Sequence, residues 1–206
     1  ALNGDIYQIP LGRELVCEEF WWIRKDWLDK LELEMPTTID EYYDVVTAFS
    51  NNDPNGNGVK DEIPVFDRSN DWDDGEYLAV WDSSHEFYPR DGVITYEPYT
   101  ENYKYAIGQM AKWYKEELID PELFTRGMAA RDTLFSGDIG GSTHDWVSTG
   151  SYNVSLDGIV EGFEVMPMAP LKNQNGEIIE RKRRYPGSGW GISTQCANPV
   201  DVIKFM

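Results

Sequence analysis

Hydrophobic positions along the chain follow two different periods, which indicates a mixture of strands and helices. Residues 20–23 (Phe-Trp-Trp-Ile) form a short, continuously apolar run, as expected for a strand buried on both faces. Residues 103–118 instead carry apolar side chains at helical spacing and predict the clearest helix of the chain. Its predicted inward stripe consists of Tyr103, Ile107, Met110, Ala111, Tyr114 and Leu118.

The sequence predicts the start of a helix at Thr38. Thr38 and Glu41 have the spacing of a capping box, in which each side chain accepts a hydrogen bond from the backbone of the other residue. The apolar residues that follow recur three and four positions apart, so they form one face of the helix. This predicted inward face consists of Tyr42, Val45, Val46 and Phe49.

The other expected elements alternate along the chain. Strands are predicted at 6–9, 63–66, 93–96, 163–168 and 189–193, and helices at 24–33, 131–135, 144–153 and from 198 onwards. Such alternation is typical of a layered α/β domain.

Composition and charge exclude some classes of function. The chain has 206 residues, of which 41% are hydrophobic, so it can bury a core. Its net charge of −19 argues against sequence-independent binding to nucleic acid or anionic lipid, since both attract basic surfaces. The basic run 181–184 follows two glutamates and is interpreted as solvated rather than as a nucleic-acid patch.

The ends of the chain and its two cysteines say little about where the protein is located. No stretch reaches the roughly 20 apolar residues that a membrane-spanning helix needs. The chain opens at Ala1 in mid-pattern and ends within a helical pattern at Met206, so we expect a piece of a longer protein. Cys17 and Cys196 could pair in a secreted protein or remain buried thiols, and the sequence leaves both open.

Residues 51–64 (N-N-D-P-N-G-N-G-V-K-D-E-I-P) have the spacing of a loop that wraps a hard cation. Gly58 stands at position 6, where such a loop turns sharply, but Pro64 replaces the usual glutamate at position 12. A hydrophilic loop built from Asn-Gly turns is the alternative, and the number of placed oxygens favours structural Ca²⁺. The predicted ligands are Asp53, Asn55, Asn57, the Val59 carbonyl, Asp61 and Glu62.

Eight tryptophans provide a second signal, because a flat aromatic face can cover the apolar side of a sugar ring. Trp22, Trp27 and Trp113 lie in periodic apolar patterns and are assigned to the core. Trp72 and Trp146 stand beside polar side chains at expected loop-to-helix junctions, and Trp190 lies between glycines. For these three, ligand contact and ordinary packing both remain open.

Catalytic patterns are weaker. Residues 142–145 (Ser-Thr-His-Asp) contain nucleophile, base and carboxylate, but neighbours in sequence do not have triad geometry. His85 and His144 lack metal-ligand spacing with Cys or Glu. Paired carboxylates such as Glu116-Glu117 could hydrolyse glycosides, yet 37 acidic residues make such pairs common.

The order of motifs resembles the family 1 extracellular solute-binding proteins of ABC sugar importers. The motifs that carry the resemblance are W-W-I-R-K-D-W-L-D-K-L, M-P-T-T-I-D-E-Y, D-P-N-G-N-G-V-K-D-E-I-P, A-K-W-Y-K-E-E-L-I-D-P-E-L-F, L-F-S-G-D-I-G-G, A-P-L-K-N-Q-N-G and G-W-G-I-S-T-Q-C-A-N-P. The third is similar to the calcium site of a lipoprotein-type branch of that family. By itself only this loop is specific, whereas the ordered set covers nearly the whole chain.

The resemblance implies an α/β fold: one lobe of a type II periplasmic-binding-protein-like fold, with a mixed sheet flanked by helices. Residues 1–191 would form the ligand-binding lobe with the calcium loop inserted, and 192–206 would cross towards a missing second lobe. The implied ligand contacts are Trp72, His144, Asp145, Trp146 and Trp190.

The function implied by the resemblance is non-enzymatic capture of a solute, expected to be an oligosaccharide, by closure of two lobes. The implied partner is an ABC transporter permease. The implied location is extracellular, with the protein anchored to the cell membrane through a lipidated N-terminus that this piece lacks. We expect a monomer that does not bind nucleic acid. The alternative is a calcium-stabilised module, catalytic or not, of a carbohydrate-active enzyme.

Overall fold

The computed structural model describes residues 9–10, 19–68, 76–90, 92–179 and 189–205. The chain divides into two units: the larger consists of residues 19–181, and the smaller combines 1–18 with 182–206. The predicted division at residues 191 and 192 concerns the longer protein and stays a prediction.

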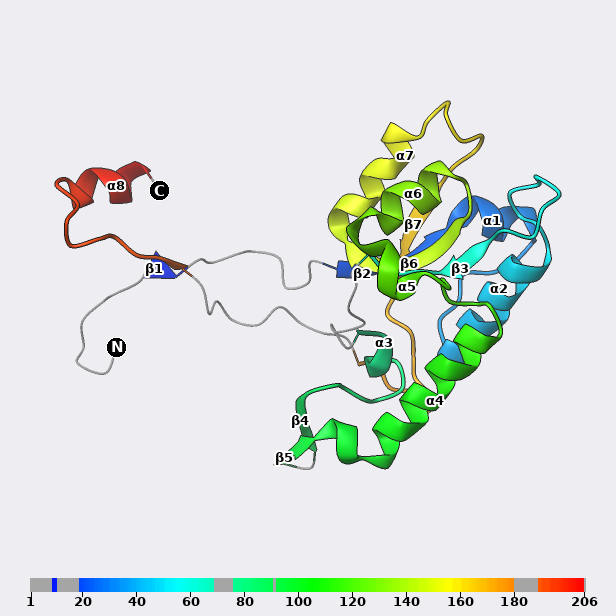
Figure 1. The fold of residues 1–206 in the computed structure, drawn as a ribbon, viewed down its shortest axis with the longest axis horizontal. Coiled ribbons are helices and arrows are strands. Elements are labelled where there is room, and N and C mark those ends of the chain that lie inside the picture. Colours follow the sequence, from blue (N-terminus) through cyan, green and yellow to red (C-terminus); the bar gives the residue numbers. More distant parts are fainter. Residues whose placement is uncertain (1–8, 11–18, 69–75, 91, 180–188, 206) are drawn as a thin grey trace. The chain divides into compact units, whose positions relative to one another are not determined.

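A four-stranded mixed sheet forms the centre of the larger unit (Figure 1). The central strand β2 (Glu19–Arg24) runs antiparallel to both of its neighbours, β6 (Gly140–Trp146) and β7 (Val165–Met168). The edge strand β3 (Ile63–Val65) pairs with β6 in the parallel direction. The short apolar run that predicted a buried strand is therefore confirmed as an interior strand of the sheet.

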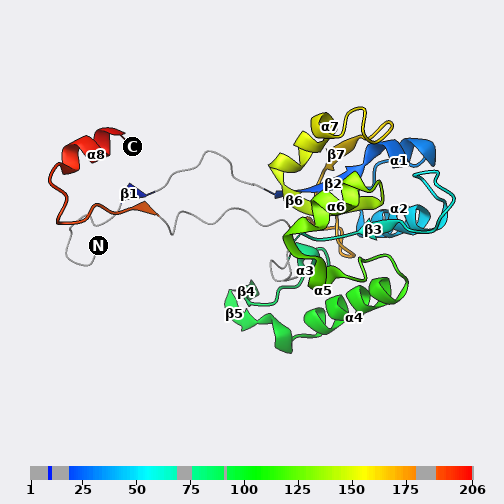
Figure 2. The same cartoon turned by 45° about the horizontal axis from the view of Figure 1, so that its top comes forward.

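Alternate residues of β2 enter two separate hydrophobic cores, because successive side chains of a strand point to opposite faces. Trp21 and Ile23 join the core that contains helices α1 (Lys25–Lys30) and α2 (Ile39–Asn51). Trp22 joins the core of α6 (Ala130–Ser136) on the other face. Figure 2 shows helices on both sides of the sheet, which is the expected layered α/β arrangement.

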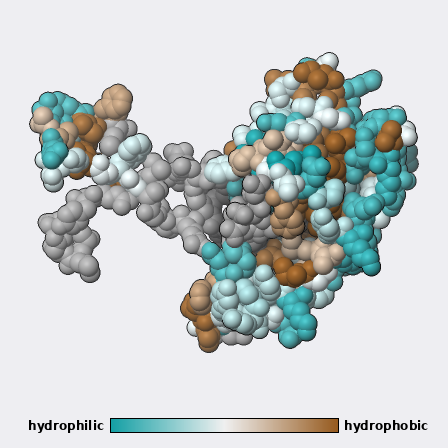
Figure 3. All heavy atoms as spheres, in the orientation of Figure 1, coloured by the Kyte–Doolittle hydropathy of each residue, from teal (hydrophilic) through white to brown (hydrophobic). Residues whose placement is uncertain are grey.

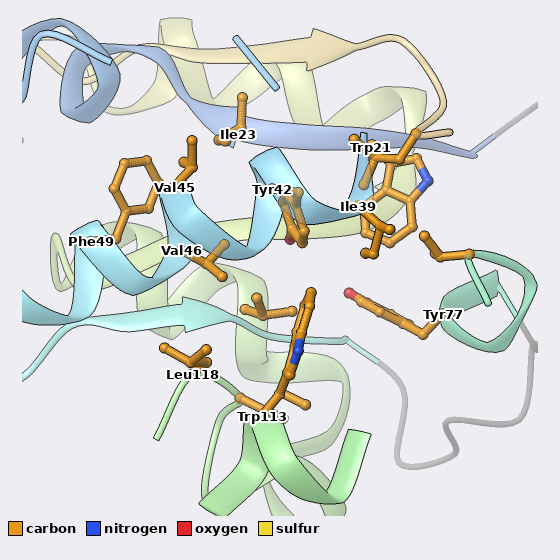
Figure 4. Packing of buried hydrophobic residues seen from close by; sticks show 14 of the residues in the cluster. Trp21, Ile23, Ile39, Tyr42, Val45, Val46, Phe49, Tyr77, Trp113 and Leu118 are labelled. Carbon is orange, nitrogen blue, oxygen red and sulfur yellow. The ribbon is translucent and has the colours of Figure 1, made fainter. Parts of the chain in front are cut away.

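Helix α2 starts as the sequence predicts. The Thr38 side chain accepts a hydrogen bond from the backbone N–H of Glu41, and the Glu41 carboxylate accepts one from the Thr38 backbone. All four residues of the predicted inward face are buried. Figure 4 shows them between β2 and the helix that carries Trp113, whose ring lies 5.9 Å from that of Tyr42.

Helix α4 (Glu101–Lys115) exists as predicted, but its predicted inward stripe is partly wrong. Ala106 and Trp113 are buried, whereas Ile107 is 40% and Tyr114 44% exposed. The indole of Trp113 lies 5.3–5.9 Å from the rings of three other aromatic residues. Packing this large ring turns the helix so that residues 106 and 113 face the core together.

Residues 87–96 form a hairpin made of β4 (Phe87–Arg90) and β5 (Val93–Tyr96), which confirms the predicted strand at 93–96. Arg90 fastens its base by donating hydrogen bonds of 2.8 Å to the carboxylates of Asp82 and Glu97. Glu97 is fully buried, whereas Arg90 is 25% exposed, so water is excluded from the carboxylate side of this ion pair. Phe87, Val93 and Ile94 are exposed and form an apolar patch on the surface over this hairpin (Figure 3).

The remaining elements are short. They are α3 (Glu76–Ala79), α5 (Leu123–Arg126), α7 (Tyr152–Ser155) and the 3₁₀ helices Glu97–Tyr99, Gly127–Ala129 and Val147–Ser151. In the smaller unit, β1 (Ile9–Pro10) pairs antiparallel with β8 (Gly189–Trp190), and α8 (Pro199–Phe205) follows. Cys196 carries a free thiol there, and Cys17 lies outside the described residues. None of the helices that the structure describes is long and apolar enough to cross a membrane.

Two glycines give opposite expectations for the free energy of unfolding. A Cβ at Gly141 would lie 2.9 Å from the Pro64 carbonyl oxygen, so Gly141→Ala should destabilise the chain by about 1–3 kcal/mol. A Cβ at Gly108 in α4 meets nothing within 4 Å, so Gly108→Ala should stabilise it by about 0.5–1 kcal/mol. Urea unfolding of both variants measures the difference, and equal midpoints would contradict the close packing of β6.

Candidate functional site

The loop between α2 and β3 is organised by the side chain of Asp53. Its two carboxylate oxygens accept hydrogen bonds of 3.0 Å from the backbone N–H groups of Asn57 and Gly58. Gly58 has φ 78°, which a glycine adopts without strain. The predicted sharp turn at position 6 of the loop is therefore present.

Asp61 lies opposite the two loop asparagines. Its carboxylate accepts hydrogen bonds of 3.1–3.2 Å from the side-chain amides of Asn55 and Asn57. These three side chains therefore face one another across the loop. The Val59 carbonyl accepts a hydrogen bond from the backbone N–H of Asp61, which closes the turn.

Glu62 is buried at the end of the loop, only 8% exposed, and neither of its carboxylate oxygens makes a hydrogen bond of ordinary geometry. Burial raises the pKa of Glu62, and the negative charges of Asp61 and Asp53 raise it further. The backbone N–H groups of Glu62 and Asp61 lower this pKa only in part. A buried carboxylate with such weak donors is costly unless a cation or a proton compensates it. Glu62 is thus the strongest indication that a positive charge would stabilise this loop.

The loop fits a calcium ion in some respects and not in others. Among the described residues, no three His, Cys, Asp or Glu side chains are grouped as a metal site. Calcium, however, also takes amide and backbone carbonyl oxygens, which this loop provides. Asn55 and Asn57 turn their N–H groups towards Asp61, so both amides would have to rotate to offer oxygens. The calcium site stays a prediction.

The loop rests on neighbouring elements through a buried arginine. The Asn55 amide donates to the Asp138 carbonyl at 3.1 Å, and the Asp138 carboxylate pairs with Arg24 at 2.6 Å. Arg24 is fully buried, and its guanidinium lies 4.6 Å from the ring centroid of Trp27. These contacts connect the loop to β2 and to the turn that precedes β6.

A second candidate region lies at the end of β6, where the sequence analysis placed a helix over 144–153. That assignment is wrong for residues 144–146, which continue the strand, and a 3₁₀ helix, η4, begins only at Val147. Cross-strand pairing with β2 holds these residues extended, since Trp21 pairs with His144 and Glu19 with Trp146. Every β6 residue up to Asp145 is buried, and Trp146 is 40% exposed.

The structure places His144 and Asp145 on opposite faces of the sheet. His144 is 5% exposed, and its ring packs edge-on against Trp21 at 5.1 Å. The Asp145 carboxylate is buried on the other face, where it accepts hydrogen bonds from Arg68 at 3.0 Å and Arg131 at 3.1 Å. Of the three adjacent predicted contacts, only the Trp146 side chain is substantially open to solvent.

The two other predicted ligand contacts are separate from this group. Trp190 belongs to the smaller unit, where it pairs with Ile9 and is 58% exposed. Trp72 lies outside the described residues. The assignment of all five residues to a ligand site therefore stays a prediction.

Sequence reasoning missed Arg68 and Arg131. They are 77 and 14 residues away from Asp145, and nothing in their surroundings marks them as its partners. The sequence offered no signal for them, because the burial of Asp145, which makes a charged partner necessary, is visible only in the structure.

A surface cavity of about 700 Å³ lies elsewhere in the larger unit. Glu62, Lys60 and Tyr114 are among its lining residues, and Trp146 is not. This hollow belongs to the surroundings of the loop and not to the exposed end of β6.

Comparison with known proteins identifies relatives, although no family model matches the chain. The chain is 37% identical over 138 residues to the fructooligosaccharide ABC transporter substrate-binding protein FusA of Streptococcus pneumoniae serotype 4 (strain ATCC BAA-334 / TIGR4), which covers 60% of this chain and 26% of FusA. It is 28% identical over 217 residues to lipoprotein LipO of Bacillus subtilis (strain 168), covering 99% of this chain and 41% of LipO.

The fold has solved counterparts. The alginate-binding protein AlgQ2, in a crystal structure without calcium ion, matches with a TM-score of 0.81 and 37% identity over 100% of this chain and 43% of AlgQ2. A structure of FusA, described as an EF-hand mutant in complex with fructo-nystose, matches with a TM-score of 0.63 and 27% identity, covering 92% of this chain and 39% of FusA.

These likenesses confirm the family resemblance and the expected periplasmic-binding-protein-like α/β fold. The chain spans less than half the length of each of these relatives. FusA and AlgQ2 are named as binding proteins and not as enzymes, and the descriptions of their structures mention calcium or an EF-hand.

The buried carboxylate of Glu62 leads to a prediction for calcium-free buffer. Because the folded state raises the pKa of Glu62, it binds a proton more readily than the unfolded state, and its stability falls as pH rises through that pKa. Glu62→Gln should remove this loss and be more stable than the parent chain at neutral pH with chelator present. Thermal unfolding between pH 4 and 8 measures the effect, with the exposed Glu34→Gln as control. If Glu62→Gln and the parent chain lost the same stability as pH rises, the assignment of this loss to Glu62 would be contradicted.

Proposed function

We infer that this chain, which is related in sequence and fold to the solute-binding proteins of ABC transporters, forms one wall of a cleft that captures a carbohydrate. The observation that carries this inference is Trp146, a partly exposed indole at the end of a strand whose other residues are all buried. A rigid strand presents this ring to solvent at a fixed place. Rigid elements position binding groups more accurately than loops do.

Carbohydrate is the class of ligand that best suits this ring. An indole face covers the apolar side of a pyranose or furanose, and neighbouring polar groups bind the hydroxyls. FusA is named for fructooligosaccharide and AlgQ2 for alginate, so relatives of this chain bind sugars of different chemistry. We propose an oligosaccharide as the ligand, with Trp146 in contact with it and with Trp72 and Trp190 as further contacts.

The whole protein would act by capture and delivery, without catalysis. Its remaining part would provide the opposing lobe, and closure of the two lobes would enclose the sugar. A membrane permease of the ABC type would then receive it. The name of LipO suggests attachment to the outer face of the cell membrane through a lipidated N-terminus. Protease treatment of intact cells tests this location, because an internal protein would resist it.

We also propose that the loop 51–64 binds calcium as a structural ion. The buried Glu62 carboxylate and the ring of Asp53, Asn55, Asn57 and Asp61 support this proposal. The loop joins α2 to β3, so an ion there would fasten the chain between a core helix and the sheet. Its role would be stability, since the loop does not include Trp146.

Calcium should stabilise the protein through this loop. At a free concentration one hundred times its Kd, calcium bound to the folded state alone adds about 2.7 kcal/mol. Asp53→Ala should abolish this gain, because Asp53 provides two oxygens at the first ligand position. Asp44→Ala is the matched control. It removes the same charge from an exposed position of α2 and should leave the stabilisation by calcium unchanged. Thermal unfolding with calcium and with chelator measures both, and a calcium response that survives Asp53→Ala would refute the site.

Sugar binding should depend on Trp146. In the full-length protein, Trp146→Ala should lower the affinity for oligosaccharide by about tenfold or more while the protein stays folded, because the lost stacking involves the exposed part of the ring. Phe124→Ala removes an aromatic residue that is 66% exposed elsewhere and should have no effect on affinity. Calorimetry with fructo-oligosaccharides and alginate oligosaccharides measures both variants. Steady turnover of these sugars by the wild-type protein would contradict the non-enzymatic function.

A further inference from the structure

The carboxylate of Asp145 is fully occupied by donors of its own chain. Oδ1 accepts hydrogen bonds from Nε of Arg68 at 3.0 Å and from the backbone N–H of Trp146 at 2.6 Å. Oδ2 accepts one from Nη1 of Arg131 at 3.1 Å. Because the side chain is also only 2% exposed, the carboxylate offers a ligand no accessible oxygen.

We propose that Asp145, held between Arg68 and Arg131, is a positioning residue that fixes the indole of Trp146 for stacking on the sugar. This inference rests on the proposed function, because it assigns Trp146 as the ring that contacts the ligand. A positioning role through the backbone of Trp146 thereby replaces the direct sugar contact that the family resemblance implies for Asp145.

The fixation of Trp146 acts from both sides along the chain. On the N-terminal side, the Asp145 carboxylate holds the Trp146 N–H, and the Asp145 carbonyl accepts a hydrogen bond from the indole Nε1 of Trp22 at 3.1 Å. On the C-terminal side, the same Nη1 of Arg131 that binds Asp145 also donates to the Thr149 hydroxyl at 2.8 Å. Thr149 lies in the 3₁₀ helix that directly follows Trp146 and is fully buried.

Packing against Trp22 further restricts the backbone of this 3₁₀ helix. A Cβ at Gly150 would lie 3.1 Å from the indole of Trp22, so the 3₁₀ helix rests directly on that buried ring. The backbone on either side of Trp146 is therefore tied to groups that cannot move without opening a core. With this backbone already fixed, only the side-chain torsions of Trp146 remain to be ordered when a sugar stacks on its ring, which favours binding.

Arg68 gives the same carboxylate a second task. Its guanidinium pairs with Oδ1 of Asp145 at 3.0 Å. Asp145 therefore holds Arg68, which follows β3 in the chain, in addition to the backbone of Trp146. Asp145 forms an ion pair with both Arg68 and Arg131, so its removal would leave two guanidinium groups near each other without this negative charge.

The first test needs no ligand. Full-length protein labelled with 5-fluorotryptophan gives one ¹⁹F resonance for each tryptophan, and Trp146→Phe assigns that of Trp146. Asp145→Asn and Arg131→Gln should shift or broaden the Trp146 resonance, and Arg131→Lys should restore it in part. Asp120→Asn is the matched control, because Asp120 is a fully buried carboxylate paired with Arg126 at 2.7 Å. An unchanged Trp146 resonance in Asp145→Asn would overturn the proposal.

The second test is a double-mutant cycle on affinity, measured by calorimetry with fructo-oligosaccharides and alginate oligosaccharides. Asp145→Asn should weaken binding by about tenfold when Trp146 is present and by less than about twofold in the Trp146→Ala background. Equal losses in both backgrounds would overturn the proposal, because Asp145 would then act independently of Trp146. If the wild-type protein binds none of these sugars, the proposed function fails, and the ¹⁹F spectra still decide whether Asp145 positions Trp146.

Discussion

The larger unit depends on the passage of β6 through the middle of its sheet. The strand is flanked by β3 and β2 and has helices against both faces, so six successive residues from Gly140 to Asp145 are buried. At Gly140 and Gly141 the neighbours lie so close that a Cβ would approach them to 2.9 Å. This close approach fixes the position of the strand, and with it the place where Trp146 leaves the sheet. The candidate sugar contact is thus set by packing far from the ring itself.

Buried ion pairs are the second recurring feature of a chain whose net charge is −19. Arg24 pairs with Asp26 and Asp138, Arg126 with Asp120, and Arg68 and Arg131 with Asp145, and in each group one partner is almost completely buried. Such pairs add little net stability, because both charges lose their hydration, but removal of one partner is expensive. Their effect is to specify which elements come together: the turn before β6 with β2, α5 with the turn before it, and the end of β6 with α6.

The two candidate sites divide the work between stability and recognition. The loop 51–64 connects a core helix to the sheet and contains a buried carboxylate with only weak backbone donors, which suits a structural ion. The end of β6 presents an aromatic ring on a rigid base, which suits a ligand that is bound and released. Binding proteins need a preorganised surface and no reactive group, because their task ends when the ligand is handed over. The arrangement of Trp146 meets this requirement.

Several features of the fold and site were readable in the sequence because their causes are local. The capping box of α2 spans four residues, the strand character of residues 20–23 follows from their uninterrupted apolar run, and the turn of the loop follows from Asp53 and Gly58. The tertiary structure alone decided the rest. It extended β6 through residues 144–146, since cross-strand pairing with β2 outweighs local helical preference, and it turned α4 so that the Trp113 ring could pack among three aromatics. It also brought Arg68 and Arg131 to Asp145, because a buried charge takes its partners from whatever part of the chain the packing places beside it.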